Sequence, residues 1–202
     1  MVPGSCSTGI HILLEELDLL FEAHIINIPK GENQRAEYLA INPKGTIPTI
    51  VLKNGIALTE FQSIAYYLAI NNPNAKLLPD HPVAQAKAME IMAYVVNTIH
   101  GQGFARIFAT DSFRVDGCDL QFIKDKGLEI VKNGFDVLNQ QLINKEFDSE
   151  NFSIADAALF YIEFWADKLD IPLPTHCQSH YERMLKRAVI KRVLMEEGYY
   201  RK

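Results

Sequence analysis

Residues 47–58 are Ile47-Pro48-Thr49-Ile50-Val51-Leu52-Lys53-Asn54-Gly55-Ile56-Ala57-Leu58. An Asn-Gly pair between two apolar, β-prone runs is the strongest short signal for a β-hairpin. Apolar residues then recur at helical spacing from Phe61 to Leu68, and Thr59 stands where an N-cap belongs. We therefore expect an antiparallel strand pair that leads directly into a helix.

Upstream of the hairpin, short elements alternate in type. A helix is expected at residues 10–17, where apolar residues recur at i, i+3, i+4 and i+7, and Ser7 or Thr8 could cap it. Residues 21–28 are rich in apolar and β-branched side chains and predict a strand. A short helix is expected at residues 36–41. This order of elements is typical of a small α/β domain.

Downstream of the hairpin, three prolines within residues 72–82 cannot propagate a helix and indicate a linker. Beyond them we expect helices alone. One long helix is predicted at 83–109, bent near its glycines, and another is predicted around 128–142, where apolar residues lie three and four apart. Residues 152–156, Phe-Ser-Ile-Ala-Asp, form a capping box with a hydrophobic staple at the start of a further helix.

The chain therefore divides into two expected domains. Residues 1–74 form the α/β domain, residues 75–82 the linker, and residues 83–202 an all-helical domain. The helical domain is expected to end in two helices, at 178–187 and 189–197.

Composition excludes several classes of function. The formal net charge is -5, the pI is near 5.7 and the basic residues are scattered, so nucleic acid is not an expected partner. No run approaches the roughly 18 to 20 apolar residues that a membrane span needs. Cys6, Cys118 and Cys177 are an odd number without a close pair, which argues against a disulfide framework and a zinc site. A reducing cytoplasm fits best.

The turn Val2-Pro3-Gly4-Ser5-Cys6-Ser7 places a cysteine just before a helix. Unpaired N–H groups and the helix dipole favour a thiolate at such a position, so Cys6 is a candidate for a thiol that reacts at neutral pH. The alternative is a buried cysteine that packs as a small apolar residue.

Two further segments carry polar or backbone groups that suit a peptide ligand. Pro48 opens a strand and could hold a cis bond, which would free the N–H and C=O of Ile47 to pair with an extended peptide; an ordinary trans proline is the commoner alternative. Glu60 lies in the first turn of a helix, where it could hold an ammonium while nearby N–H groups hold an anion. Alternatively, Glu60 only complements the helix dipole.

Together these segments resemble the glutathione transferase family, and residues 3–7 with residues 40–45 are similar specifically to its bacterial beta class. The resemblance covers nearly the whole chain, including residues 152–157. It implies a thioredoxin-like N-terminal domain, an all-helical C-terminal domain, a cytoplasmic homodimer and a detoxifying enzyme that conjugates glutathione to small hydrophobic electrophiles without a metal.

The resemblance also implies roles for individual residues. Cys6 would face the glutathione sulfur. The other glutathione contacts would be Lys30 for the glycine carboxylate, Ile47 beside a cis Pro48 for the cysteinyl backbone, and Glu60 with the N–H of Phe61 for the γ-glutamyl end. His100 would line the acceptor pocket, although a single histidine late in a helix is as often structural.

The sequence departs from the family pattern at two places. Only Met1 and Val2 precede Pro3, where the family has a strand inside the sheet, so either the chain starts late or the sheet holds only a stub of its first strand. Phe61 stands where a small residue usually follows the acid, which predicts a bulkier wall.

Three functions remain open from the sequence. The first is conjugation, for which Ser5 or Ser7 could replace Cys6 as the hydroxyl that stabilises the thiolate. The second is a glutathione-dependent thiol-disulfide reductase that uses Cys6. The third is a non-catalytic interaction protein that keeps the fold.

Overall fold

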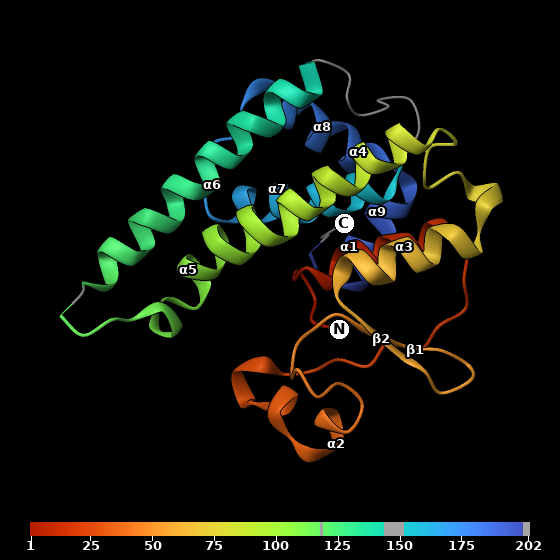
Figure 1. The fold of residues 1–202 in the computed structure, drawn as a ribbon, viewed down its shortest axis with the longest axis horizontal. Helices are drawn as coiled ribbons and strands as arrows, with labels where there is room; N and C mark the ends of the chain where they lie inside the picture. The colour runs from red at the N-terminus through yellow and green to blue at the C-terminus, as the bar shows by residue number, and fades with distance from the viewer. Residues whose placement is uncertain (118, 144–151, 200–202) are drawn as a thin grey trace.

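A computed structural model describes residues 1–117, 119–143 and 152–199. The N-terminal third forms a small unit with one hairpin, and helices make up the remainder (Figure 1). Cys118 lies outside the described residues. None of the helices in the described ranges has the length and apolar character required to span a bilayer.

The N-terminal unit confirms the expected hairpin and its flanking helices. Its elements are α1 (Ser7–Glu16), η1 (Ile28–Lys30), η2 (Glu32–Gln34), α2 (Ala36–Leu39), β1 (Thr49–Val51), β2 (Ala57–Thr59) and α3 (Phe61–Asn71). The strands pair antiparallel with Ile50 opposite Leu58. Gly55 takes a positive φ of 83°, which the tight turn requires and glycine adopts without strain.

The predicted helix caps are wrong. Cys6, rather than Ser7 or Thr8, is the N-cap of α1, and no side chain caps that helix. Thr59 ends β2, and Glu60 is the N-cap of α3. Helix α1 therefore begins earlier than the preference of Ser and Thr for N-cap positions indicates, and α3 begins one residue later.

The strand predicted at 21–28 is not formed. Among the described residues, only Met1 forms backbone hydrogen bonds with residues 21–26: its amino group donates to the carbonyl of His24 at 2.6 Å, and its carbonyl accepts from the N–H of Ile26 at 2.9 Å. Met1 thus bonds to the two residues on either side of Ile25, which is the hydrogen-bond pattern of parallel strands. A single paired residue is too short to form a strand. Beside this segment lies a cavity of about 1400 Å³, lined by residues that include Leu20, Tyr38 and Val51.

Beyond α3 the described residues form helices joined by short loops and no strand, as expected. The first of these elements are η3 (Pro73–Ala75), α4 (Pro82–Ala93), η4 (Tyr94–Phe104), α5 (Ala105–Phe108), η5 (Thr110–Phe113) and α6 (Leu120–Ile143). The bend predicted near Gly101 and Gly103 is replaced by a π-helix, η4, so that α4, η4 and α5 form one long rod beside α6 (Figure 1). Glycines allow this close approach: a Cβ on Gly127 would meet the carbonyl oxygen of Gly103 at 2.8 Å.

Helix α7 (Ile154–Lys168) lies at the centre of the molecule, followed by α8 (Thr175–Lys186) and α9 (Ala188–Glu196). The capping box at its start is confirmed, with the N–H of Ser153 donating to Asp156 at 2.8 Å. Every residue from Ile154 to Ala166 is buried. Because α1 packs against α3, α7 and α9, the N-terminal unit and the helices share one core.

Candidate active site

Cys6 and Ile47 meet at the N-terminus of α1. The Sγ atom of Cys6 lies 3.6 Å from the carbonyl oxygen of Ile47, and the peptide bond between Ile47 and Pro48 is cis, as predicted. The N–H of Ile47 has no hydrogen-bond partner among the described residues. The carbonyl, which we expected to be free, faces the thiol instead.

The thiol of Cys6 is not the ready thiolate that its position suggested. Cys6 is only 7% exposed, and burial raises the pKa of its thiol to about 12. The backbone N–H groups of Cys6 and Ser7 oppose this shift, and the carboxylate of Glu60 adds to it. Desolvation outweighs the effect of the helix N-terminus, so the raised pKa keeps the Cys6 thiol protonated at neutral pH.

The two neighbouring serines are engaged with the backbone of Val2. The hydroxyl of Ser5 donates to the carbonyl of Val2 at 2.6 Å, while the hydroxyl of Ser7 accepts from the N–H of Val2 at 2.9 Å. The two hydroxyl oxygens lie 2.8 Å apart. Their hydrogen bonds brace the turn, which weakens both as replacements for Cys6.

Glu60 has an unusual backbone conformation at the start of α3. Its φ of 69° is in the region that disfavours side chains, and such conformations cluster at ligand sites. Its carboxylate is half exposed and accepts from Nζ of Lys44 at 2.7 Å. Lys44 also donates to the hydroxyl of Thr59 at 2.9 Å, which holds the ammonium beside the acid.

Phe61 does not form the bulky wall that its position predicted. Its side chain is buried and packs against the ring of Tyr161, with centroids 5.4 Å apart. A Cβ on Gly9 would lie 2.7 Å from the Phe61 ring, so α1 and α3 approach closely at this point. The phenyl ring belongs to the core between α3 and α7, and only its backbone N–H remains at the helix start.

Lys30 lies apart from these residues, exposed at the last position of η1. Its backbone N–H bonds to Asn27, and its ammonium has no ion-pair partner in the described ranges. No hydrogen bond or ion pair in the described ranges joins Lys30 to Cys6 or Glu60.

His100 is part of an aromatic cluster between η4 and α7. Its ring packs edge-on against Trp165, with centroids 4.8 Å apart, and its Nδ1 lies 3.2 Å from the hydroxyl of Tyr161. Burial lowers the pKa of His100 to about 4, so the ring is neutral at physiological pH. Phe104 and the half-exposed Phe108 also pack edge-on against Trp165, each with its ring centroid 5.2 Å from that of the indole.

The aromatic cluster joins the cysteine turn through Trp165. The indole Nε1 donates to the carbonyl of Gly4 at 2.6 Å, two residues before Cys6. Sequence reasoning missed Trp165 and Tyr161, and it also missed Lys44 beside Glu60. Their contacts join positions 15 to 161 residues apart, which no local pattern reveals.

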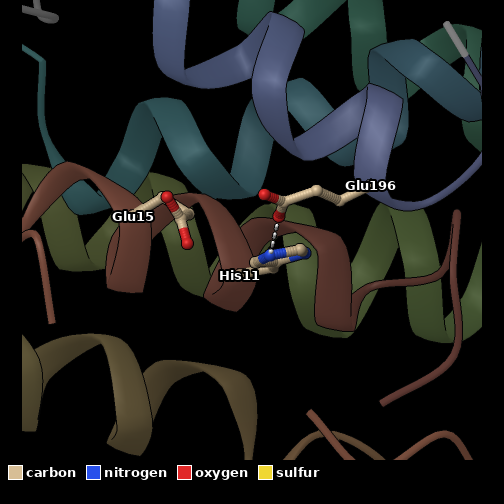
Figure 2. Close-up of side chains that lie close together, drawn as sticks. All are labelled: His11, Glu15 and Glu196. Atoms are coloured by element: carbon tan, nitrogen blue, oxygen red, sulfur yellow. Dashed lines mark ion pairs between the residues drawn. The ribbon is translucent and has the colours of Figure 1, made fainter. Parts of the chain in front are cut away.

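A second group of polar side chains lies behind the turn, between α1 and α9. His11, Glu15 and Glu196 each bring one possible ligand atom within 4.8 Å of the others (Figure 2). His11 already pairs with Glu196 at 3.1 Å, and Glu15 pairs with Arg192 at 2.7 Å. The arrangement is a set of ion pairs that ties the first helix to the last.

Comparisons with known proteins agree on one family. A model of the glutathione S-transferase N-terminal domain matches residues 4–69. The glutathione S-transferase GstA of Escherichia coli O157:H7 is 30% identical over 201 residues, which cover 97% of this chain and 96% of that protein.

Solved structures extend the likeness to the whole fold. A glutathione transferase homologue from Sulfitobacter, crystallised with bound glutathione, is 25% identical with a TM-score of 0.88 over 99% of this chain and 97% of that chain. A beta-class glutathione S-transferase of Sphingomonas chungbukensis, 24% identical, has the same fold with a TM-score of 0.81 over 99% of this chain and 98% of that chain.

Proposed function

The chain belongs to the glutathione S-transferase family, and we propose that it joins the thiolate of glutathione to small hydrophobic electrophiles at a site centred on Cys6. The observation that carries this proposal is the meeting of Cys6 with the cis Ile47–Pro48 peptide beside the strained Glu60. A thiol, an unpaired backbone N–H and an exposed carboxylate at a helix N-terminus together complement a small peptide that contains a thiol.

Glutathione would lie across these groups in an extended conformation. Its cysteinyl unit pairs with the free N–H of Ile47. Its γ-glutamyl ammonium meets Glu60, and its γ-glutamyl carboxylate accepts from the N–H of Phe61 at the start of α3. The glycine carboxylate would reach Lys30, whose exposed ammonium carries no ion pair in the described ranges and is therefore available.

The state of the Cys6 thiol favours conjugation over disulfide exchange. A buried S–H whose pKa is about 12 can donate a hydrogen bond to a bound thiolate, and thiolate stabilisation lowers the pKa of the glutathione thiol. The glutathione thiolate then attacks the carbon of an aryl halide. The C–S bond forms, halide leaves with the bonding electrons, and the thiol proton passes to solvent.

The electrophile would pack on the aromatic cluster of His100, Trp165 and Phe108. Neutral imidazole, indole and phenyl rings suit an apolar aromatic substrate. Since Trp165 donates to Gly4, this surface adjoins the turn that carries Cys6.

The test compares conjugation with disulfide reduction in the wild-type protein and in Cys6→Ala and Cys6→Ser. We expect wild type to conjugate chlorodinitrobenzene, Cys6→Ala to lose about tenfold in kcat/KM, and Cys6→Ser to keep part of the rate through its hydroxyl. A wild type that reduces mixed disulfides but does not conjugate supports the reductase instead. Failure to bind immobilised glutathione at millimolar ligand would reject both enzymes and leave the interaction protein.

We also propose that the protein acts as a cytoplasmic homodimer. Tyr66 and Ile70 on α3 and Val83 on α4 are large apolar side chains that remain exposed in the single chain. Cys6 and Cys177 are both free thiols, which suits a reducing compartment. Light scattering after size-exclusion chromatography measures the mass; a monomeric mass at micromolar concentration contradicts the dimer.

A further inference from the structure

The carboxylate of Glu197, which follows α9, reaches the turn that carries Cys6. Its Oε2 accepts a hydrogen bond from the N–H of Gly4 at 2.7 Å and another from the hydroxyl of Thr8 at 2.6 Å. Its Oε1 lies 2.9 Å from Nδ1 of His11. The Glu197 side chain is 1% exposed, so these contacts are made away from water.

Gly4 is also held from its other side. Its carbonyl accepts from the indole of Trp165 at 2.6 Å, while the hydroxyl of Tyr199 donates to the carbonyl of Pro3 at 3.3 Å. The φ of Gly4 is 71°, and a Cβ there would clash with the hydroxyl of Tyr199. Both backbone groups of Gly4 are thus fixed by residues from the C-terminal part of the chain.

Cys6 lies two residues beyond Gly4 and two before Thr8, so the contacts of Glu197 bracket it. The chain between them is a single turn, with the N–H of Thr8 bonded to the carbonyl of Ser5 at 3.0 Å. A shift of Gly4 or Thr8 would move the Sγ of Cys6 relative to Ile47. Misplacement of a reacting group by about 1 Å can cost a hundredfold in rate.

We propose that Glu197 is a positioning residue for the transferase reaction, fixing the Cys6 turn from the far end of the chain. This inference rests on the proposed function, in which Cys6 is the group beside the glutathione sulfur. Glu197 itself does not touch the substrate. It acts through Gly4 and Thr8.

The neighbouring Glu196 provides a matched control. It pairs with Nε2 of the same His11, as Figure 2 shows, but its side chain is 48% exposed and forms no hydrogen bond or ion pair with residues 3–8 within the described part of the chain. Glu196→Gln therefore removes a carboxylate from the same helix end and the same histidine without touching the turn. A difference between Glu196→Gln and Glu197→Gln isolates the hydrogen bonds to Gly4 and Thr8.

The first measurement is steady-state kinetics with glutathione and chlorodinitrobenzene. We expect Glu197→Ala to lower kcat by about a hundredfold and Glu197→Gln, which keeps an acceptor oxygen, by about tenfold. The KM for the electrophile should stay within twofold, and Glu196→Gln should keep the wild-type kcat. A purely structural anchor would lower the melting temperature but leave kcat unchanged below it, and that result overturns the proposal.

The second measurement does not depend on transferase activity. The rate at which iodoacetamide alkylates Cys6, followed by mass spectrometry of its peptide, reports how firmly the turn buries the thiol. We expect Glu197→Gln to raise this rate several-fold and Glu196→Gln to leave it unchanged. Equal alkylation in both variants overturns the proposal even if wild type shows no transferase activity, so the two failures are distinguishable.

Should Glu197→Ala not fold, Thr8→Val removes one of the three contacts at nearly constant shape. It should show the same pattern as Glu197→Gln, with lower kcat and faster alkylation. A Thr8→Val protein with wild-type values for both would contradict the positioning role.

Discussion

The Nδ1 atom of His100 lies 3.2 Å from the hydroxyl of Tyr161, and this contact joins η4 to α7. Burial holds the His100 ring neutral and raises the pKa of Tyr161 well above its usual range, so both groups are uncharged at physiological pH. Together with Trp165 they form an uncharged aromatic cluster, which we propose as the acceptor side of the site.

We expect His100→Ala to raise the KM for an aromatic electrophile about fivefold, because it removes a ring from that cluster, and to leave the KM for glutathione unchanged. Tyr161→Phe keeps the ring and deletes only the hydroxyl, so it should have a smaller effect. Steady-state kinetics with both substrates varied checks this. An increase in the glutathione KM alone would contradict the assignment of His100 to the acceptor side.

We expect Glu60 to bind glutathione and to make no contact with the electrophile. Glu60→Gln keeps the size of the side chain but removes the charge that would pair with the γ-glutamyl ammonium. The KM for glutathione should rise about tenfold, as expected when a charged hydrogen bond is lost. Isothermal titration with glutathione provides an independent value, and Glu37→Gln on α2 is the control for charge alone. Equal affinity in Glu60→Gln and wild type would exclude Glu60 from the site.

A buried cluster in the helical domain should make stability depend on pH. His180 on α8 lies 2.8 Å from Glu163 and 3.0 Å from Asp156, both on α7. Burial alone would lower the pKa of His180, but the two carboxylates raise it to about 9, and burial raises the pKa of Glu163 to about 7. The folded protein therefore keeps protons that the unfolded chain has released.

The sign follows from these shifts. The contribution of His180 is complete below its unfolded pKa near 6.5 and is lost as the pH rises through about 9; the raised pKa of Glu163 acts in the same direction between about 4.5 and 7. Wild type should lose several degrees of melting temperature between pH 6.5 and 9.5. In His180→Gln the melting temperature should be lower and its slope flatter over that range. If the melting temperature of His180→Gln fell with pH as steeply as that of wild type, His180 would not be the cause of the pH dependence.

Helix α6 approaches η4 too closely for a side chain at Gly134. A Cβ there would lie 2.5 Å from Cγ1 of Ile99, which is fully buried. Gly134→Ala should therefore destabilise the protein by about 1 to 3 kcal/mol despite the better helix propensity of alanine. Asn133→Ala, at the exposed neighbouring position, should not. Urea denaturation of both variants tests the difference; a stabilised Gly134→Ala would show that the helices can separate at little cost.

Local chemistry explains which parts of the fold were predictable. The hairpin at Asn54-Gly55, the capping box at Ser153 and the apolar spacing of α6 are signals contained in a few residues, and all three are confirmed. The strand at 21–28 did not form because a strand needs a partner strand, and Met1 is the one described residue whose backbone pairs with residues 21–26. The composition of a segment indicates a preference for strand, but the segment forms a strand only when another strand pairs with it.

The candidate site divides in the same way. The cis peptide at Pro48 was expected from the family resemblance, because the neighbouring residues alone favoured a trans bond. The helix that follows Cys6 was expected from its apolar spacing, but its cap was placed at Ser7 or Thr8. The pKa of Cys6 could not be predicted, because it depends on how deeply α1 is packed against other elements. Lys44, Trp165 and Glu197 were missed, since only the folded chain brings them to residues far away in the sequence.

The contact of Gly4 with Glu197 brings the two ends of the described chain together, 193 positions apart in sequence. A circular permutant that joins these ends through a short linker would keep the cysteine turn in place. An affinity tag fused close behind Glu197 would instead disturb the hydrogen bond between Glu197 and Gly4. The position of such a tag would then change the measured kcat as well as the ease of purification.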